Sequence, residues 1–329
     1  MATSRFGELG LIVTNSHPCL GREVAACLGI TPLEVESRQF DNGELDVRRL
    51  CDVSGRDICI FSSLHSRYDT IGELRRLCNS VQGAARIFGV FPFVRDGKSD
   101  HTKRHGESVA YEETAFQISS SGIEVVAIFD QHSSQHPGFY DKRHYNLRKV
   151  HHVYLMRVLI EYALAHSDEI DAVLTLDAGG LKRNAIVASM LEKPVAFINK
   201  YRDPITRQVI PGKSMVIGDI KDMRVAAFDD MLQEGGTLAL GAEIAKLKGA
   251  KSISFFVVHN DFSPNTWARI NPLLESGMVD KVYTLGTLPL LDKEKWHPNM
   301  VVLSPAELIA EVIDRIHYEK HMRKLFLEV

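Results

Sequence analysis

The sequence predicts an α/β protein with mainly parallel sheets flanked by helices, and three observations support this class. Short apolar runs of the length of buried parallel strands recur along the whole chain. Segments of helical hydrophobic period lie between these runs, as in units that pair strands in parallel. With 329 residues and 45% apolar side chains, the chain is long enough for two domains with substantial cores.

The alternation assigns the elements in order. The expected strands are short apolar runs, at residues 11–14, 58–62, 87–91, 125–129, 172–176, 195–198, 215–218, 225–228, 252–258 and 281–284. The expected helices have a helical hydrophobic period, at 17–28, 70–85, 109–120, 153–165, 184–191, 238–248 and 305–317. We place the domain boundary near the helix at 153–165. An N-terminal α/β domain, 1–152, would hold a nucleotide loop; a C-terminal α/β domain, 153–329, would hold a sugar-phosphate loop, and its last helix could pack on the first domain.

Composition argues against several classes of function. The net charge is −3 and the charges of both signs are interleaved, so nothing points to nucleic acid or to a membrane as partner. The N-terminus has no signal-peptide pattern, and no apolar run approaches the length of about 18 residues that a membrane span needs. The odd number of cysteines, without a CxxC pair, favours the reducing cytoplasm.

The segment 224–249 has the pattern of a sugar-phosphate site. The carboxylates of Asp229 and Asp230 directly follow a predicted strand, and the glycine turn Gly235-Gly236-Thr237 leads into a predicted helix. Ligands of open α/β sheets bind beyond the carboxyl ends of strands, and a helix N-terminus favours a phosphate. Vicinal sugar hydroxyls could donate to the two carboxylates. The alternative is an ordinary βα-turn with a solvated acid pair.

Two other loops suit a triphosphate and its metal ion. Asp130, His132 and Asp141 follow a predicted strand and are residue types that could organise Mg²⁺ shared with phosphates. Asp177 precedes the turn Ala178-Gly179-Gly180, in which successive backbone N–H groups form a nest for an anion. A polar loop with a satisfied histidine and a tight βα-turn are the alternative interpretations.

Two polar segments complete the pattern. Lys200 and Arg202 are two residues apart after a predicted strand, so an extended chain points both the same way. Two cations there suit phosphoryl transfer, although a solvated charge run is the more common explanation. The stretch 95–105 has no apolar side chain, which predicts a long mobile loop that acts as a lid. The alternative is a disordered surface loop.

Together these segments resemble one family, ribose-phosphate pyrophosphokinase (PRPP synthetase), from residue 15 to about residue 326. Residues 130–141, DQHSSQHPGFYD, align without gaps to the family's D-L-H-x-x-Q-x-x-G-F-F-D, which is highly specific. Four shorter segments resemble the family's other motifs: 39–47 (QFDNGELDV), 176–184 (LDAGGLKRN), 199–202 (NKYR) and 228–237 (FDDMLQEGGT).

The resemblance implies a transferase that moves the β,γ-diphosphoryl group of ATP to the 1-hydroxyl of ribose 5-phosphate, with Mg²⁺. It implies two domains of the phosphoribosyltransferase type and a homodimer or homohexamer with an ATP site across a subunit interface. The implied site residues are catalytic Lys200, Arg202 and His132; nucleotide-binding Phe40, Asn42, Glu44, Lys98, Ser99, Asp100 and His101; ribose 5-phosphate-binding Asp229, Asp230, Gly235, Gly236 and Thr237; pyrophosphate-loop Asp177, Ala178, Gly179 and Gly180; and metal-binding Asp130, His132, Asp141 and Asp177.

The chain departs from the family's motifs in three segments. Gln233 and Glu234 stand where the family has an Asp and a Thr. Coulomb repulsion disfavours a carboxylate facing a phosphate, so we expect Glu234 to point away or the loop to bind something else. Residues 98–101 (KSDH) stand at the family's R-Q-D-R, and Asn42 replaces an acid that usually reads the adenine. The second hypothesis is therefore a catalytically impaired homologue that binds nucleotide, or binds a true synthetase and regulates it.

Overall fold

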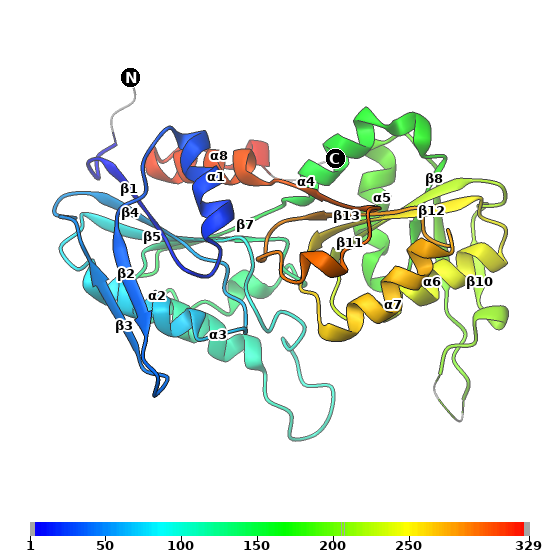
Figure 1. The fold of residues 1–329 in the computed structure, drawn as a ribbon, viewed down its shortest axis with the longest axis horizontal. Helices are drawn as coiled ribbons and strands as arrows, with labels where there is room; N and C mark the ends of the chain where they lie inside the picture. The colour runs from blue at the N-terminus through cyan, green and yellow to red at the C-terminus, as the bar shows by residue number, and fades with distance from the viewer. Residues whose placement is uncertain (1–3, 205, 207, 326–329) are drawn as a thin grey trace. The chain divides into compact units, whose positions relative to one another are not determined.

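The structure is a computed structural model that describes residues 4–204, 206 and 208–325. The outer ends of both expected domains, residues 1–3 and 326–329, lie outside the described residues. The predicted α/β class is confirmed: helices flank two sheets whose strands pair mainly in parallel (Figure 1). Every described helix is too short or too polar to cross a membrane.

The described chain divides into two units. Unit 1 runs as far as Leu155 and also takes in Thr287–Pro289 and the chain from Ser304 onward. Unit 2 comprises Met156–Gly286 and Leu290–Leu303. The last helix therefore belongs to unit 1 although it follows unit 2 in the sequence. The expected division into domains 1–152 and 153–329 stays a prediction.

Unit 1 is built on a five-stranded sheet in the order β1-β4-β5-β6-β7, with all pairs parallel. Its strands are β1 (Leu9–Val13), β4 (Asp57–Phe61), β5 (Arg86–Phe91), β6 (Val125–Phe129) and β7 (Lys149–Val153). Figure 1 shows α1 (Pro18–Leu28) and α8 (Ala306–His317) on one face and α2 (Thr70–Ser80) and α3 (Ala110–Ser119) on the other. Because helices cover both faces, β4 is buried along its whole length, as its run DICIF predicts.

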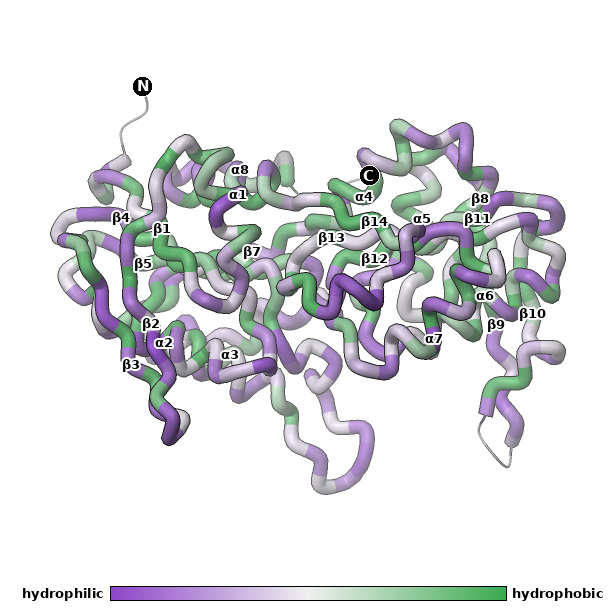
Figure 2. Tube along the Cα trace, in the orientation of Figure 1, coloured by the Kyte–Doolittle hydropathy of each residue, from purple (hydrophilic) through white to green (hydrophobic). Residues whose placement is uncertain are grey.

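A separate hairpin projects from unit 1. Its strands, β2 (Val35–Gln39) and β3 (Leu45–Arg49), pair antiparallel, with Gln39 opposite Leu45. Exposed and half-buried residues alternate along both strands, which is the period of a sheet with one solvated face. Figure 2 shows that the tip of the hairpin is hydrophilic.

Unit 2 is built on a seven-stranded sheet in the order β10-β9-β8-β11-β12-β13-β14, parallel except for the edge strand β10. Its strands are β8 (Ala172–Thr175), β9 (Val195–Asn199), β10 (Met215–Ile217), β11 (Arg224–Met231), β12 (Ser252–His259), β13 (Lys281–Leu285) and β14 (Met300–Leu303). In Figure 1, α4 (Met156–Ala165) and α5 (Leu181–Met190) lie on one face, and α6 (Gly236–Leu247) and α7 (Pro264–Glu275) on the other.

Side chains from both faces of β12 fill the two layers of unit 2. Ile253, Phe255 and Val257 join the core cluster that includes residues of α6 and α7. Phe256 points the other way and stacks between Phe228 and Tyr283, with ring centroids 4.6 and 4.5 Å apart. Each buried side chain of this size contributes roughly 1.5–3 kcal/mol.

The structure corrects several expected boundaries. Asp229 and Asp230 lie inside β11 and not after it, because their backbone continues to pair alongside β12. Gly236 and Thr237 form the first turn of α6 instead of a turn before it. The helix expected at 153–165 begins at Met156, since residues 149–153 form the edge strand β7. The sequence analysis also missed β2, β3, α7 and β14.

The order of the strands in unit 2 brings three loops together. β9, β8 and β11 are neighbours in the sheet, and parallel strands end at the same edge. The loops after these strands contain residues 176–180, 200–203 and 232–235. They therefore gather beyond the carboxyl ends of the strands, where α/β proteins bind ligands.

Candidate functional site

The acid pair of unit 2 lies beside an arginine. Arg183 on α5 places Nη1 3.0 Å from Asp229 Oδ1 and 3.3 Å from Asp230 Oδ1. The Asp230 side chain is 7% exposed and that of Asp229 is 35% exposed. Burial and the negative charge of Asp230 raise the pKa of Asp229 to about 7, although Arg183 opposes the shift. The two adjacent carboxylates offer oxygen acceptors to a ligand.

Asn184 fixes the helix that carries Arg183. Its buried side-chain amide donates to the backbone oxygens of Gly180 (3.0 Å) and Phe228 (2.9 Å) and accepts from the N–H of Phe228 (3.1 Å). The amide thus joins the start of α5 to β11 just before the acid pair. A buried amide with several partners is costly to remove, so Asn184 sets where Arg183 meets the carboxylates.

Asp177 and Lys200 meet at the ends of β8 and β9. The Gly180 N–H donates to Asp177 Oδ1 at 3.2 Å, so Asp177 caps the short 3₁₀ turn Ala178–Gly180. Lys200 Nζ lies 3.9 Å from Asp177 Oδ2. Burial and, to a smaller degree, Arg202 lower the pKa of Lys200, and Asp177 counteracts them. A partly desolvated cation beside an anion-binding turn suits a transferring phosphoryl group.

The phosphate loop lies at the N-terminus of α6. Gly235 is its N-cap, with φ +79°, and a Cβ there would approach Ile270 Cδ1 to 2.7 Å, so glycine is required. The carboxylate of Glu234 forms an ion pair with Arg269 on α7, at 3.0 Å. Gln233 Nε2 donates to Asp261 Oδ2 at 2.7 Å. The two unusual residues of the loop thus connect it to the segment that leads into α7 and to α7 itself.

In unit 1 the carboxylates expected to bind metal have partners in the protein. Asp130 adopts a left-handed backbone (φ +38°), and its Oδ2 accepts the N–H of Leu155. Asp141 accepts from the N–H groups of Arg143 (2.9 Å) and His144 (3.2 Å) and from the His144 ring (2.8 Å). These hydrogen bonds lower the pKa of Asp141. Asp141 therefore orders a turn.

A polar chain connects the loop 95–105 with the loop 130–141. His136 Nε2 lies 3.1 Å from Asp100 Oδ2, and His136 Nδ1 lies 3.2 Å from Gln131 Oε1, which also accepts from the Tyr111 hydroxyl at 2.9 Å. His136 is fully buried and stacks on Tyr111, with centroids 3.9 Å apart. Both ring nitrogens face acceptors, an arrangement that the doubly protonated ring satisfies. His101 Nδ1 approaches Asp100 Oδ1 at 2.6 Å.

Of the remaining expected nucleotide residues, Phe40, Asn42, Glu44 and Lys98 are exposed and Ser99 is half-buried. Phe40 is 41% exposed at the tip of the β2–β3 hairpin, and the Arg38 guanidinium lies 5.1 Å from its ring centroid. Asn42 Oδ1 accepts the N–H of Glu44 at 3.1 Å, which orders the turn between the strands. Lys98 and Ser99 lie in the loop 95–105, where the Ser99 carbonyl accepts the N–H of Tyr111 at 3.1 Å. An exposed aromatic ring beside a guanidinium offers a stacking surface for a base.

The carboxylates of these loops differ in how well they suit Mg²⁺. Among the described residues, no group of three His, Cys, Asp or Glu side chains could hold a metal ion. Mg²⁺ in phosphate chemistry uses one or two carboxylates and completes its shell with phosphates and water, so a ready-made cage is not needed. Asp177 fits this requirement, since its side chain is 49% exposed beside the anion nest. Asp141 fits less well because three donors already engage it.

Within unit 2 the structure thus brings Asp177 together with Lys200 in the loops after β8 and β9, and Asp229 together with Asp230 near the carboxyl end of the neighbouring strand β11. The sequence analysis missed the roles of five residues: Asn184, Arg183 as partner of the acid pair, Arg269, His136 and Gln131. Arg183 and His136 lie inside segments that resemble family motifs, so their position among the polar residues of these motifs could have indicated a role. Arg269 had no such signal, because α7 itself was missed.

Comparison with known proteins agrees with this geometry. Residues 9–122 match the family model for the N-terminal domain of ribose phosphate pyrophosphokinase, and residues 152–271 match the phosphoribosyl transferase domain. The chain is 30% identical to the ribose-phosphate pyrophosphokinase of Prochlorococcus marinus subsp. pastoris over 97% of this chain and 94% of that protein. It is 28% identical to the chloroplastic ribose-phosphate pyrophosphokinase 1 of Oryza sativa subsp. japonica, over 94% of this chain and 76% of that protein.

A solved structure is similar over nearly the whole chain. The phosphoribosylpyrophosphate synthetase from Mycobacterium smegmatis superposes with a TM-score of 0.83 at 27% identity, covering 94% of this chain and 98% of that one. The parallel sheets and the strand-end loops define a protein of the phosphoribosyltransferase type with two such domains. Within that class, the chain belongs to the ribose-phosphate pyrophosphokinase family.

Proposed function

We propose that the protein is a ribose-phosphate diphosphokinase: it transfers the β,γ-diphosphoryl group of ATP to the 1-hydroxyl of ribose 5-phosphate and yields PRPP and AMP. Family membership along 97% of the chain carries this proposal. In the reaction the sugar O1 attacks the β-phosphorus of ATP, and the bond from that phosphorus to the oxygen of the leaving AMP breaks. The hydroxyl proton is released as the new bond forms.

The contacts in unit 2 support a role for each loop. Asp229 and Asp230 would accept hydrogen bonds from the ribose hydroxyls, held in place by Arg183. The 5-phosphate would bind at Gly235–Thr237, on the free N–H groups of α6. Lys200 and Arg202 would stabilise the negative charge of the transferring group, and Asp177 to Gly180 would hold the pyrophosphate.

Mg²⁺ is the cofactor that this function requires. When bound, it would neutralise charge on the triphosphate and so favour transfer. Asp177 and His132 are the residues that we propose hold it together with substrate phosphates, with Asp130 and Asp141 as further candidates. We also propose a cytoplasmic location.

The decisive experiment incubates the purified protein with Mg²⁺, ribose 5-phosphate and each of ATP, GTP and CTP, and measures PRPP and the nucleoside monophosphate. Formation of both products in equal amounts is expected with ATP. Their absence with every nucleotide would favour the second hypothesis, the impaired homologue. That hypothesis is not favoured, because the charged residues expected at the transfer site are all present and Glu234 is paired with Arg269.

The same assay examines the choice of base. We expect discrimination that is weaker than, or different from, a strict preference for ATP, because Asn42, Lys98, Ser99 and His101 replace an acid and arginines of the family's motifs. A site rejects a wrong base strongly when buried polar groups would lose their partners. Here none of these four side chains is fully buried, so a wrong base should cost less. A preference for ATP above about a hundredfold, roughly 2.7 kcal/mol, would contradict this expectation.

A homodimer or homohexamer is the proposed assembly. Phe40 and Glu44 would complete the nucleotide site of a second subunit, because they lie at the exposed tip of a projecting hairpin. Light scattering at micromolar concentration should show an oligomer, and Phe40→Ala should weaken ATP binding. Tight nucleotide binding by a monomer would contradict the proposal. Leu50→Ala, another exposed apolar residue near this hairpin, is the matched control.

A further inference from the structure

We propose that Arg269 on α7 binds the 5-phosphate of the sugar substrate and that Glu234 is its internal competitor, which holds the guanidinium until the phosphate displaces it. The inference rests on the proposed function, since it adds a residue of α7 to the ribose 5-phosphate site. It assigns opposite effects on affinity to the two members of one ion pair.

Arg269 lies directly over the phosphate loop. Its Nη1 donates to the Glu234 carboxylate at 3.0 Å and lies 3.3 Å from the Glu234 backbone oxygen. A Cβ built on Gly236 would lie 3.5 Å from the same nitrogen. Gly236 is the first residue of α6, so the guanidinium lies where the first-turn N–H groups of this helix are available.

The backbone around Arg269 is fixed to the same loop. The Thr266 hydroxyl donates to the backbone oxygen of Gln233, and Thr266 also takes part in the capping box at the start of α7. Gln233 Nε2 donates to Asp261 Oδ2 at 2.7 Å. The end of the Arg269 side chain can therefore change partner while α7 and the loop stay in register.

Electrostatics favours the exchange of Glu234 for a phosphate. The side chains of Arg269 and Glu234 are 44% and 60% exposed, and such exposed ion pairs contribute little to stability. A phosphate dianion carries more charge than a carboxylate, matches the guanidinium fork and also gains the N–H groups of α6. Glu234 therefore lowers the affinity of this site for phosphate, both by occupying Arg269 and by repelling the anion.

The test measures binding of ribose 5-phosphate, and separately of inorganic phosphate, to the full-length protein by calorimetry. Glu234→Gln should bind ribose 5-phosphate about three- to tenfold more tightly, and Arg269→Gln about tenfold more weakly. The affinity of Arg269→Lys should lie between those of the wild type and Arg269→Gln, because lysine keeps the charge and loses the fork. In the coupled assay these variants should change KM for ribose 5-phosphate far more than kcat.

A similar ion pair provides the matched controls. Arg157 and Glu161 on α4 lie 2.7 Å apart with side chains 40% and 57% exposed, so Arg157→Gln and Glu161→Gln should leave sugar affinity unchanged. Unchanged sugar and phosphate affinity in a folded Arg269→Gln protein that still binds ATP would overturn the inference and leave the proposed function intact. Inorganic phosphate binding that depends on Arg269, without any binding of ribose 5-phosphate, would instead overturn the proposed function and support Arg269 as an anion-binding residue.

Discussion

At the scale of single residues, Lys200 is the side chain with the clearest expected role in transfer. Its ammonium is half-buried beside Asp177, so it is held in place and partly desolvated before substrate arrives. Preorganised charge of this kind acts mainly on the transition state, where negative charge moves to the bridging oxygen.

We predict that Lys200→Ala lowers kcat by about 10²–10³ and changes the affinity for ATP much less. Steady-state kinetics gives the first quantity and calorimetry the second. Lys193→Ala is the control, since Lys193 lies just before the opposite end of the same strand, β9. Turnover of Lys200→Ala close to that of the control would exclude Lys200 from the mechanism.

The acid pair gives a second prediction, on pH. The pKa of Asp229 is raised to about 7 from an ordinary value of about 4. The stabilisation from this extra bound proton is complete below pH about 4 and is lost as the pH rises through about 7. The wild type should therefore lose stability as the pH rises from 5 to 8, whereas Asp229→Asn should not. Denaturant unfolding should show that the free energy of unfolding of Asp229→Asn, relative to the wild type, increases over this range.

Asp171→Asn is the matching control, because the pKa of Asp171 is shifted in the opposite direction from that of Asp229. Hydrogen bonds from Arg224 lower the pKa of Asp171, so its stabilising charge is present above pH about 4 and is lost only as the pH falls. The stability difference of Asp171→Asn from the wild type should stay constant between pH 5 and 8. If Asp229→Asn also gave a constant difference, the raised pKa of Asp229 would be refuted.

At the scale of elements, the two polar loops of unit 1 are joined through His136. The loop 95–105 carries neither helix nor strand, and Asp100 connects it to the buried ring. Whether this loop moves as a lid stays a prediction. Since the loop contains the expected nucleotide residues 98–101, its position should affect nucleotide binding directly.

We predict that His136→Leu weakens ATP binding by about tenfold, because Asp100 and Gln131 each lose a hydrogen-bonding partner and the loop loses its anchor. KM for ATP should rise more than kcat falls. His105→Leu, at an exposed position of the same loop, should leave ATP binding unchanged. Equal ATP affinities in the two variants would refute the anchor.

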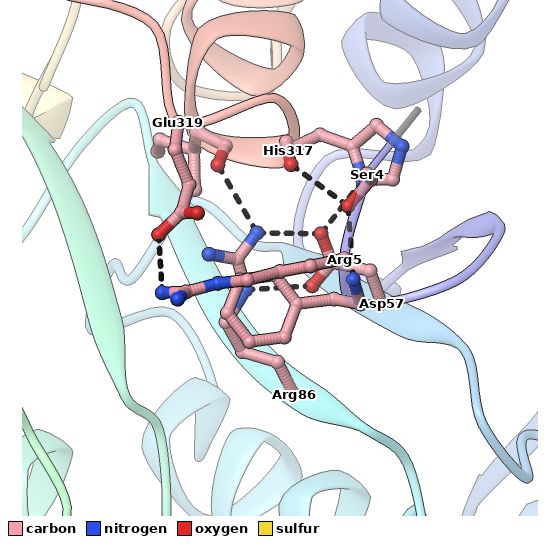
Figure 3. A network of polar contacts seen from close by, with 8 residues as sticks. Ser4, Arg5, Asp57, Arg86, His317 and Glu319 are labelled. Atoms are coloured by element: carbon pink, nitrogen blue, oxygen red, sulfur yellow. Dashed lines mark hydrogen bonds and ion pairs between the residues drawn. The ribbon is translucent and has the colours of Figure 1, made fainter. Parts of the chain in front are cut away.

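At the scale of the whole molecule, a buried polar network closes unit 1 between segments far apart in the sequence (Figure 3). Arg86 on β5 forms two hydrogen bonds with Asp57 on β4, at 2.8 and 2.6 Å, and also donates to the Ile316 oxygen of α8. His317 Nδ1 lies 2.7 Å from Asp57 Oδ2, and Ser4 donates to the His317 oxygen. The network therefore holds α8 on the sheet after the chain returns from unit 2.

We predict that Asp57→Asn lowers the free energy of unfolding by about 3–5 kcal/mol, because it leaves the buried Arg86 without a charged partner. The Asp57→Leu/Arg86→Met double variant should lose less than the sum of the two single changes. Arg5→Gln breaks the exposed Arg5–Glu319 pair of the same region and should cost less than about 1 kcal/mol. Similar losses in Asp57→Asn and Arg5→Gln would show that burial does not decide the contribution.

The sequence by itself determined the fold class and identified the strand-end segments that we propose as the site. Apolar runs such as 125–129 and 172–175 are buried on both faces, and their composition alone predicts parallel strands. The order of carboxylate, glycine turn and helix at Asp177 and at Asp229 is local in the chain, so it could be recognised without the fold. Three of the missed elements lack such a signal, because β2 and β3 are largely polar and α7 contains Pro272. The run MVVL of β14 is apolar and as long as β8, so this strand could have been predicted from the sequence.

Tertiary structure alone decided which side chains meet. Arg183 contacts the acid pair because β8 and β11 are neighbours in the sheet and Asn184 joins α5 to β11. Arg269 reaches the phosphate loop because α7 packs beside α6, and it is this contact that provides a partner for the unexpected Glu234. The order of strands in a sheet depends on packing over the whole unit, so no local pattern of residues encodes these contacts.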